Sequence, residues 1–287
     1  MSDLNPTEKK FEDHIELYFT SNGYKSIHHS NYNTSICLIP EEVINFIQKS
    51  QPQKWENLCD IHGSDVEKKI LNRISKQISS RGVLDVLRDK VSDHGEEIEL
   101  CFFKPKNDLN EGHMQLYKMN SFRIIRQLNF SEKNPDQSID LGLFINGIPL
   151  VTIELKNQLT NQNIIHSQIQ YSKRDKNEPL LQFKRCLAHF CIDNNKASMT
   201  SKLAGENTFF LPYNKGIENP PTDGYRSEYM WKEVLEKDSV LDILENFAHL
   251  SKKKEYYFNE KTNSVEAKTK EMLIFPRYHQ LALNRKF

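Results

Sequence analysis

The stretch SIDLGLFINGIPLVTIELK, residues 138–156, contains two apolar runs on either side of the pair Asn146-Gly147. An Asn-Gly pair between apolar runs is a strong signal for a tight turn that joins two antiparallel strands. Asp140 lies near the start of the first run, and Glu154 and Lys156 lie at the end of the second. The stretch therefore predicts a hairpin that carries two acids and a lysine.

Side chains alternate between the two faces of a strand, so the apolar positions indicate which polar residues share a face. Six apolar residues alternate along the two runs and should face one core: Ile139, Leu141, Leu143, Val151, Ile153 and Leu155. Asp140 then lies on the opposite face, together with Glu154 and Lys156.

The connection between the strands must preserve this arrangement. An uncorrected two-residue turn at Asn146-Gly147 would place Asp140 opposite Ile153, on the wrong face. We therefore predict a three-residue loop over 145–147, which pairs Asp140 with Thr152, or a bulge that restores the parity.

Two acids and a lysine on one face of a sheet are the groups that a magnesium-dependent nuclease requires. Magnesium takes oxygen ligands, usually one or two carboxylates with water and substrate phosphate. Asp140 and Glu154 would hold Mg²⁺, with Mn²⁺ as a substitute and the carbonyl of Leu155 as a third ligand. Lys156 would orient the attacking water or neutralise developing charge. Gly142 would let a DNA backbone approach closely.

The Glu-x-Lys pattern alone has little specificity, because it occurs at Glu8-Lys10, Glu67-Lys69, Glu154-Lys156 and Glu266-Lys268. Only the third lies in an apolar strand with an acid on the neighbouring strand. The alternative is an ordinary edge hairpin with a solvated polar face, since motif matches often mislead.

Composition sets broad limits. The chain has 287 residues with 37% hydrophobic and 27% charged residues, which is enough for one large domain or two. The formal net charge is zero, so basic patches for DNA would be local, as at Lys173-Arg174 and Lys252 to Lys254. Five cysteines without a CxxC pair indicate reduced thiols rather than disulfides or a cysteine zinc site. His62 and the pair His28-His29 have no partner pattern and are interpreted as structural or surface residues.

The start of the chain, MSDLNPTEKK, is not a signal peptide, and no apolar run reaches 18 residues. We therefore expect a soluble, cytoplasmic protein without a membrane span. No GxxxxGK[ST] motif is present, so the sequence contains no nucleotide-binding loop of that type.

Residues 6–21 are expected to form an amphipathic helix with an apolar stripe at Phe11, Ile15 and Phe19. A second stripe on this helix is acidic and consists of Glu8, Glu12 and Glu16. This stripe is either a solvated face, or Glu12 turns toward the metal and helps to place it.

The remaining patterns predict a mixed α/β sheet with helices on its faces. Ser64 and Glu67 suggest a capping box. The expected helices are 41–49, 52–60, 64–79, 82–90, 161–172, 228–236, 239–249 and a short helix after Pro276. The expected strands are 97–103, 122–129, 187–193 and 208–211, with a further hairpin over 252–265.

The helix over 161–172 carries Gln168 and Tyr171 on neighbouring turns. An amide and a phenol there would hydrogen-bond phosphate oxygens or orient Lys156. The alternative is an ordinary packing helix that crosses the sheet.

Several motifs in order resemble the N-terminal part of the restriction (R) subunit of Type I restriction-modification enzymes. They run from Glu8, Phe11 and Glu12 through Asn129-Phe130-Ser131, Asp140, NGIPLVTIELKNQ, QYSKRDKNEPL, FKRCLAHFCID, TSKLAGENTFFLPYNKG, NPP, TDGY, YMWKEVLEKDSVLDIL and FPRYHQ. The resemblance covers nearly the whole chain.

This resemblance implies the PD-(D/E)xK restriction-endonuclease-like fold, with Asp140, Glu154 and Lys156 as the catalytic set and Mg²⁺ at the two acids. Ser138 and Ile139 precede Asp140 where the signature has proline. The family also has a Gln-x-x-x-Tyr motif on the next helix. Here the sequence reads Gln168-Ile169-Gln170-Tyr171, so the spacing differs, and the three polar residues are accessory candidates.

The resemblance further implies a nuclease domain over 1–250 with helical insertions, and a linker with the start of an ATP-dependent translocase over 251–287. Gln280, in FPRYHQ, would contact adenine in the complete motor. The motor is missing, so ATP would serve only the full-length subunit, and the chain looks truncated. The implied partners are double-stranded DNA and the methyltransferase and specificity subunits.

The expected function is metal-dependent endonucleolytic hydrolysis of DNA phosphodiester bonds in a translocating Type I restriction complex. One alternative is a non-catalytic docking or assembly module of that complex. Another is a solitary PD-(D/E)xK repair-type nuclease, against which the FPRYHQ segment argues.

Overall fold

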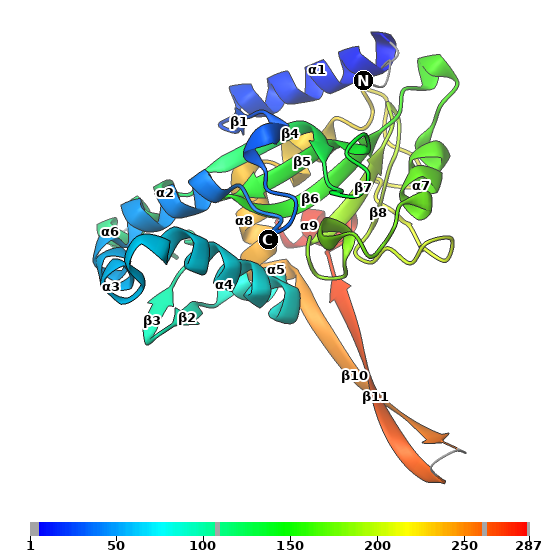
Figure 1. The fold of residues 1–287 in the computed structure, drawn as a ribbon. Coiled ribbons are helices and arrows are strands. Elements are labelled where there is room, and N and C mark those ends of the chain that lie inside the picture. Colours follow the sequence, from blue (N-terminus) through cyan, green and yellow to red (C-terminus); the bar gives the residue numbers. More distant parts are fainter. Residues whose placement is uncertain (1–5, 107–109, 260–262, 286–287) are drawn as a thin grey trace.

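A seven-stranded mixed sheet forms the centre of the computed structural model, which describes residues 6–106, 110–259 and 263–285 (Figure 1). Its strand order is β1-β4-β5-β6-β7-β8-β9. The pairs β1/β4 and β6/β7 are parallel, and the other neighbours are antiparallel. The strands are β1 Lys25–Ser26, β4 Phe122–Asn129, β5 Ser138–Ile145, β6 Ile148–Leu155, β7 Ala188–Ile192, β8 Ala197–Thr200 and β9 Leu211–Pro212.

Helices cover both faces of this sheet, as the predicted mixed α/β class requires. The α-helices among the described residues are α1 Pro6–Ser21, α2 Pro40–Ser50, α3 Pro52–His62, α4 Val66–Arg81, α5 Val83–Arg88, α6 Glu111–Lys118, α7 Ile164–Lys173, α8 Lys237–Asp242 and α9 Tyr278–Asn284. Short 3₁₀ segments lie at His29–Asn31, Gly63–Asp65, Gln158–Thr160 and Pro179–Leu181, and π-helical segments at Met230–Val234 and Ile243–Phe247.

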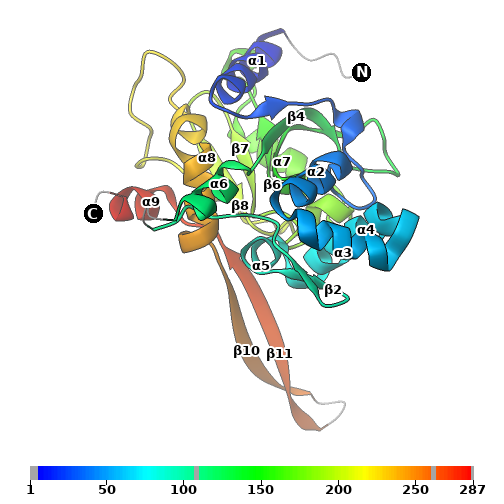
Figure 2. The same cartoon turned by 90° about the vertical axis from the view of Figure 1, so that its left-hand side faces the viewer.

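Two clusters of buried apolar side chains hold these layers together. The larger one joins α1, α2, α4, α5 and the segment around α8 to the sheet. The smaller one includes Tyr32, Phe144 and Tyr171, and it packs α7 and the segment before α2 against the opposite face. Figure 2 shows α2 to α5 gathered beside the sheet. The polar positions of β5 and β6 therefore face the side on which α7 lies.

The central hairpin confirms the predicted shared face, but by the second of the two predicted routes. Asn146 and Gly147 have φ of 49° and 81°, and Ile145 pairs with Ile148, so the turn has two residues and the three-residue loop is wrong. A bulge between Leu143 and Phe144 shifts the register. Two positive φ values are typical of a type I′ turn, which suits the right-handed strand twist.

The bulge explains the burial on both sides of the hairpin. Leu143 pairs with Val151 and Phe144 with Pro149, so Leu150 is the extra residue. Five β6 side chains consequently face the larger core: Ile148, Leu150, Val151, Ile153 and Leu155. Gly142 pairs with Thr152, which places Asp140 opposite Glu154. The predicted three-residue loop would have placed Asp140 opposite Thr152 instead.

Other sequence predictions met mixed outcomes. The helix over 6–21 and the strand over 122–129 are confirmed. The capping box at Ser64 is wrong, because Ser64 lies in the 3₁₀ turn Gly63–Asp65 and α4 begins at Val66. The expected strand 97–103 is limited to β3 Glu96–Ile98, which pairs with β2 Val91–Asp93, and 208–211 reduces to β9.

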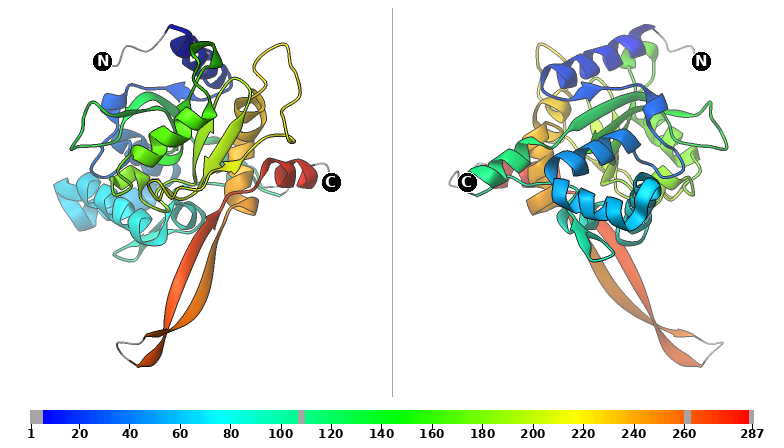
Figure 3. Two further views of the ribbon diagram at one scale, coloured as in Figure 1. Left: turned by 90° about the vertical axis from the view of Figure 1, so that its right-hand side faces the viewer. Right: turned by 60° about the vertical axis from the view of Figure 1, so that its left-hand side comes forward.

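The predicted hairpin over 252–265 is present and longer than expected. Strand β10, His249–Asn259, pairs with β11, Ser264–Ile274, over its whole length. Figure 3 shows this pair extending away from the sheet in both views. No helix in the described part of the chain combines the length and apolar content that crossing a bilayer requires.

Candidate active site

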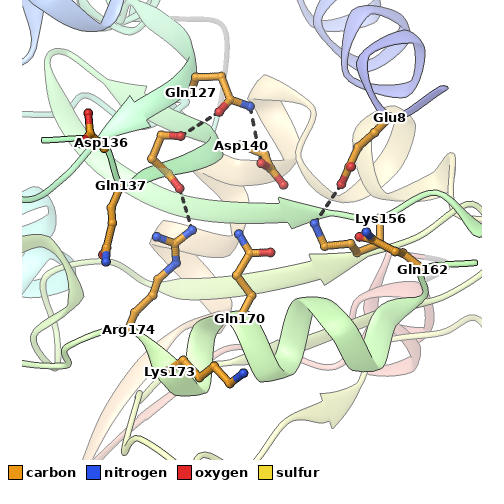
Figure 4. A pocket seen from close by; sticks show the side chains of 11 residues that line it. Glu8, Gln127, Asp136, Gln137, Asp140, Lys156, Gln162, Gln170, Lys173 and Arg174 are labelled. Atoms are coloured by element: carbon orange, nitrogen blue, oxygen red, sulfur yellow. Dashed lines mark hydrogen bonds and ion pairs between the residues drawn. The ribbon is translucent and has the colours of Figure 1, made fainter. Parts of the chain in front are cut away.

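A polar pocket of about 460 Å³ opens beside α1, β5, β6 and α7 (Figure 4). Three of its charged side chains come from α1, β5 and the end of β6, and these are Glu8, Asp140 and Lys156. The remaining lining residues are Gln127, Asp136, Gln137, Ser138, Gln162, Gln170, Lys173 and Arg174. The pocket therefore contains two of the three residues predicted to be catalytic.

Glu154 is fully buried and does not line this pocket, but it pairs with Arg174, which does. Its Oε1 atom forms an ion pair with the Nη2 atom of Arg174, which also donates to the backbone carbonyl of Ser138 at 2.6 Å. Its Oε2 atom is buried and has no hydrogen-bond partner. A buried carboxylate oxygen without a partner is costly, so this atom requires a proton or a cation.

Asp140 and Glu154 act on each other electrostatically. Asp140 Oδ2 accepts the backbone N–H of Leu155 at 2.6 Å, which fixes the carboxylate beside the strand of Glu154. Burial, and then the negative charge of Asp140, raise the pKa of Glu154 well above its usual range, although Arg174 and Lys156 oppose the shift. Two neighbouring acids with too little positive charge are a suitable site for a divalent cation.

Lys156 is oriented by α1. Its Nζ atom donates to Glu8 Oε1 at 2.8 Å, and both side chains are largely buried. Burial lowers the pKa of Lys156, but Asp140 and Glu8 outweigh burial, so the net pKa is raised. Lys156 is therefore protonated at neutral pH, and Figure 4 shows its ammonium group pointing toward Glu8.

The acidic stripe of α1 faces the sheet rather than water. Glu12 is fully buried, so the solvated interpretation is wrong for this residue. Its carboxylate accepts from Arg126 at 2.9 Å and 3.2 Å and from Gln127 at 2.7 Å. Gln127 also lies 3.5 Å from Asp140 Oδ1, so one amide connects the two acids. Burial, followed by Asp140, raises the pKa of Glu12 to about 7 despite Arg126.

Helix α7 separates its three accessory candidates. Gln170 lines the pocket, and Figure 4 shows its amide directed into it. Gln168 turns away and donates to Ser198 Oγ at 2.8 Å. Tyr171 is buried, and its hydroxyl lies 2.8 Å from the hydroxyl of Thr152. Gln170 is thus the only one of these three that reaches the pocket.

Thr152 connects Tyr171 to the sheet beneath the acids. Its Oγ1 atom also lies 2.7 Å from His189 Nδ1. Burial lowers the pKa of His189 to about 4, so this imidazole is neutral at neutral pH. Thr152, Tyr171 and His189 therefore form a buried, uncharged chain of side chains, which offers no cation to Glu154.

The structure corrects the expectation for Gly142 and shows where Gln280 lies. Gly142 leaves no room for a DNA backbone to approach, because the side chains of Leu128 and Phe144 fill the space beside it. A Cβ atom at Gly142 would lie 2.6 Å from Leu128 Cδ2 and 3.0 Å from the Phe144 ring. Gln280 lies in α9, where its Oε1 atom accepts the backbone N–H of Arg277 at 2.8 Å and caps the helix. Its predicted adenine contact stays a prediction.

Sequence reasoning missed the ion pairs of two arginines that organise this region, and it assigned Arg174 to a basic patch for DNA although its side chain is 7% exposed. Arg126 pairs with Glu12, Asp13 and Glu16 of α1, and Arg174 pairs with Glu154. The guanidinium of Arg174 also lies 4.7 Å from the centre of the Phe130 ring. The available signal was their position, because Arg126 lies in the strand next to Asp140, and Arg174 directly follows α7.

Comparison with known families places this site in context. The family model described as the Type I restriction enzyme R protein N terminus matches residues 5–208. The match includes α1, the central hairpin and α7, and it covers more than half of the chain. The chain belongs to this family.

A curated relative agrees with this assignment. It is the putative type I restriction enzyme MjaVIIIP endonuclease subunit from Methanocaldococcus jannaschii, which is 28% identical over 162 residues. The aligned part is 56% of this chain and 14% of the relative. The aligned part of the chain thus spans a small share of the length of that relative.

Proposed function

We propose that this chain is the Mg²⁺-dependent endonuclease domain of a Type I restriction R subunit and hydrolyses phosphodiester bonds of double-stranded DNA. We further propose that its sheet is a PD-(D/E)xK-type nuclease fold, with Asp140, Glu154 and Lys156 as the catalytic residues. The family membership supports the restriction role. The single observation that carries the chemistry is the buried, unpartnered Oε2 atom of Glu154 opposite Asp140.

The residues present suit a magnesium ion. Asp140 and Glu154 offer carboxylate oxygens, and a divalent cation would offset the burial and the repulsion from Asp140 that raise the pKa of Glu154. In an antiparallel pair, one residue directs its N–H and its C=O to the same neighbouring strand. The carbonyl of Leu155 is therefore a third candidate ligand, because its N–H is donated to Asp140. Bound Mg²⁺ supplies stabilisation of phosphate charge and a lowered pKa for a coordinated water.

The protein groups around the acids have separate tasks. Lys156 is protonated, so it serves as a positive hydrogen-bond donor to a phosphate oxygen or to the attacking water, and not as a general base. Glu8 holds its Nζ atom at the rim of the pocket. Gln170 and Lys173, which also line the pocket, offer additional donors for the DNA backbone.

We propose that other parts of the restriction complex deliver the DNA. The formal net charge of the chain is zero, which gives no long-range attraction for a polyanion. ATP-driven translocation, base recognition and methylation would then belong to the motor, specificity and methyltransferase components. In this proposal Gln280 contributes to the nucleotide site only when the motor is present.

The proposal is tested by plasmid cleavage in a reconstituted R-subunit complex with Asp140→Asn. Removing one metal-binding carboxylate should reduce cleavage by a factor of roughly 10² or more, while ATP hydrolysis and translocation persist. Asp136→Asn is the matched control, because Asp136 lines the same pocket but lies before β5. A non-catalytic docking role predicts instead that Asp140→Asn cleaves as well as the control.

A further inference from the structure

A second group of metal-type ligands lies at the edge of the molecule that is far from α7. His62 is the last residue of α3, and Asp93 is the last residue of β2. His94 follows in the turn between β2 and β3. Figure 1 shows α3, β2 and β3 together, on the other side of the molecule from α7. None of these three residues lines the proposed nuclease pocket.

Their ligand atoms converge on one point. His62 Nε2 lies 2.6 Å from Asp93 Oδ2, and His94 Nδ1 lies 3.2 Å from the same oxygen. One nitrogen from each imidazole and one oxygen of the carboxylate all lie within 4.8 Å of one another. Zinc-type ions bind imidazole nitrogen and carboxylate oxygen at about 2.0–2.2 Å, which places tetrahedral ligand atoms about 3.3 Å apart. Small side-chain rotations therefore suffice to surround an ion.

The two imidazole rings already have the separation that a shared ion requires. Two rings bound through nitrogen to one tetrahedral ion at about 2.0–2.1 Å have their centres about 5 Å apart. The centres of the His62 and His94 rings are 4.9 Å apart, and the ring planes are inclined by 84°. This arrangement directs one nitrogen of each ring toward Asp93 without stacking the rings.

The backbone turn does not by itself explain the histidine. His94 and Gly95 have φ of 48° and 94°, and Asp93 pairs with Glu96, so they form a two-residue turn with two left-handed residues. Asparagine followed by glycine is the usual choice for such a turn. A histidine at the first position offers nothing that asparagine lacks for the backbone, but it does add an imidazole ligand.

Besides His62 and His94, Arg73 approaches Asp93, and it does so at the other carboxylate oxygen. Arg73 Nε lies 3.9 Å from the other oxygen of Asp93, Oδ1, and donates to the carbonyl of Ser92 at 3.1 Å. The side chains of His62 and Asp93 are 6% and 11% exposed, whereas that of His94 is 62% exposed. Water thus has access to a fourth coordination position.

We propose that His62, Asp93 and His94 bind one divalent transition-metal ion of the zinc class, with water as a fourth ligand. The ion would fasten the end of α3 to the β2–β3 hairpin, and its nitrogen ligands distinguish it from the oxygen-only magnesium site proposed above. Its function is structural, because it lies outside the nuclease pocket and joins two elements of one chain.

The test is titration of the 287-residue chain with Co²⁺, read by visible d–d absorption, and with Zn²⁺, read by melting temperature. The wild type and Asp140→Asn should both give tetrahedral-type absorption and a higher melting temperature. His94→Asn keeps the residue type that the turn favours but removes one ligand. Loss of an outer hydrogen-bond partner lowers metal affinity by roughly 10–100-fold. Because His94→Asn removes a direct ligand, its affinity for Zn²⁺ should fall by more than that.

The outcomes separate the two sites. Loss of the Co²⁺ absorption in His94→Asn but not in Asp140→Asn, with unchanged circular dichroism, supports the proposal. Absent absorption in the wild type, or equal absorption in wild type and His94→Asn, overturns it. Loss in Asp140→Asn alone assigns the cobalt to the nuclease pocket and also overturns it.

Discussion

Asp140 Oδ2 accepts the backbone N–H of Leu155 at 2.6 Å, which holds the carboxylate of Asp140 beside Glu154 on the neighbouring strand. This relationship depends on one bulged residue in β6, because the two-residue turn alone would have put the acids on opposite faces. The bulge therefore connects the packing of an apolar hairpin to the chemistry of the pocket.

Arg174 should contribute strongly to stability when no divalent metal is present. Arg174→Met keeps an apolar contact with Phe130 but removes the guanidinium group that pairs with the buried carboxylate of Glu154. Loss of one partner from a buried ion pair costs about 3–5 kcal/mol. Urea unfolding in EDTA should therefore show a decrease of that order in the free energy of unfolding.

A double-mutant cycle isolates this ion pair. Glu154→Gln combined with Arg174→Met should cost clearly less than the sum of the single changes, because neither charge is then left unpaired. Lys173→Met is the control, since Lys173 is exposed and an exposed change usually stays within about 0.5 kcal/mol. Strict additivity of the two single changes would contradict the assigned ion pair.

Glu12 should make the protein less stable as pH rises through the weakly acidic range. Its ordinary pKa is 4.5, and burial followed by Asp140 raises the pKa to about 7 in the folded state. Between these values the folded state binds more protons than the unfolded state, so the free energy of unfolding falls as pH rises from 4.5 to 7.

In EDTA, Glu12→Gln should make the decrease in the free energy of unfolding between pH 4.5 and 7 smaller by on the order of 3 kcal/mol. The fold should persist, because Arg126 retains Asp13 and Glu16 as partners. The measurement is chemical denaturation at a series of pH values. A variant profile parallel to the wild type would contradict the raised pKa of Glu12.

Gly142 should resist any side chain because the packing around it is full. Its added Cβ atom would lie 2.6 Å from Leu128 Cδ2 and 3.0 Å from the Phe144 ring. Overpacking of this kind costs about 1–3 kcal/mol, so Gly142→Ala should lower the melting temperature. Gly112→Ala in α6 is the control, since its nearest neighbour would lie 3.7 Å away. Equal melting temperatures for Gly142→Ala and the wild type would contradict this packing.

The sequence predicted those features that depend on local periodicity. The helix α1 and the strand β4 follow from regular apolar spacing, and the shared face of Asp140 and Glu154 follows from strand alternation. The bulge position could not be read from alternation, because Ile148, Pro149, Leu150 and Val151 have none. Pro149 was the available hint, since proline within a sheet is found at edges and bulges.

Contacts between distant segments account for what was missed. The Lys156–Glu8 pair joins residues 148 positions apart, and the Arg126–Glu12 pair joins residues 114 positions apart. No local pattern indicates that α1 lies over these strands. For the same reason His62 showed no partner in the sequence, although Asp93 lies 2.6 Å from it in the fold.

The most direct test of the proposed active site is anomalous diffraction from crystals of this chain soaked with Mn²⁺. A manganese peak should appear between the carboxylates of Asp140 and Glu154, within bonding distance of Glu154 Oε2, which has no hydrogen-bond partner in the protein. A fully soaked crystal that gives no peak between these two acids would contradict the proposed metal-dependent nuclease site.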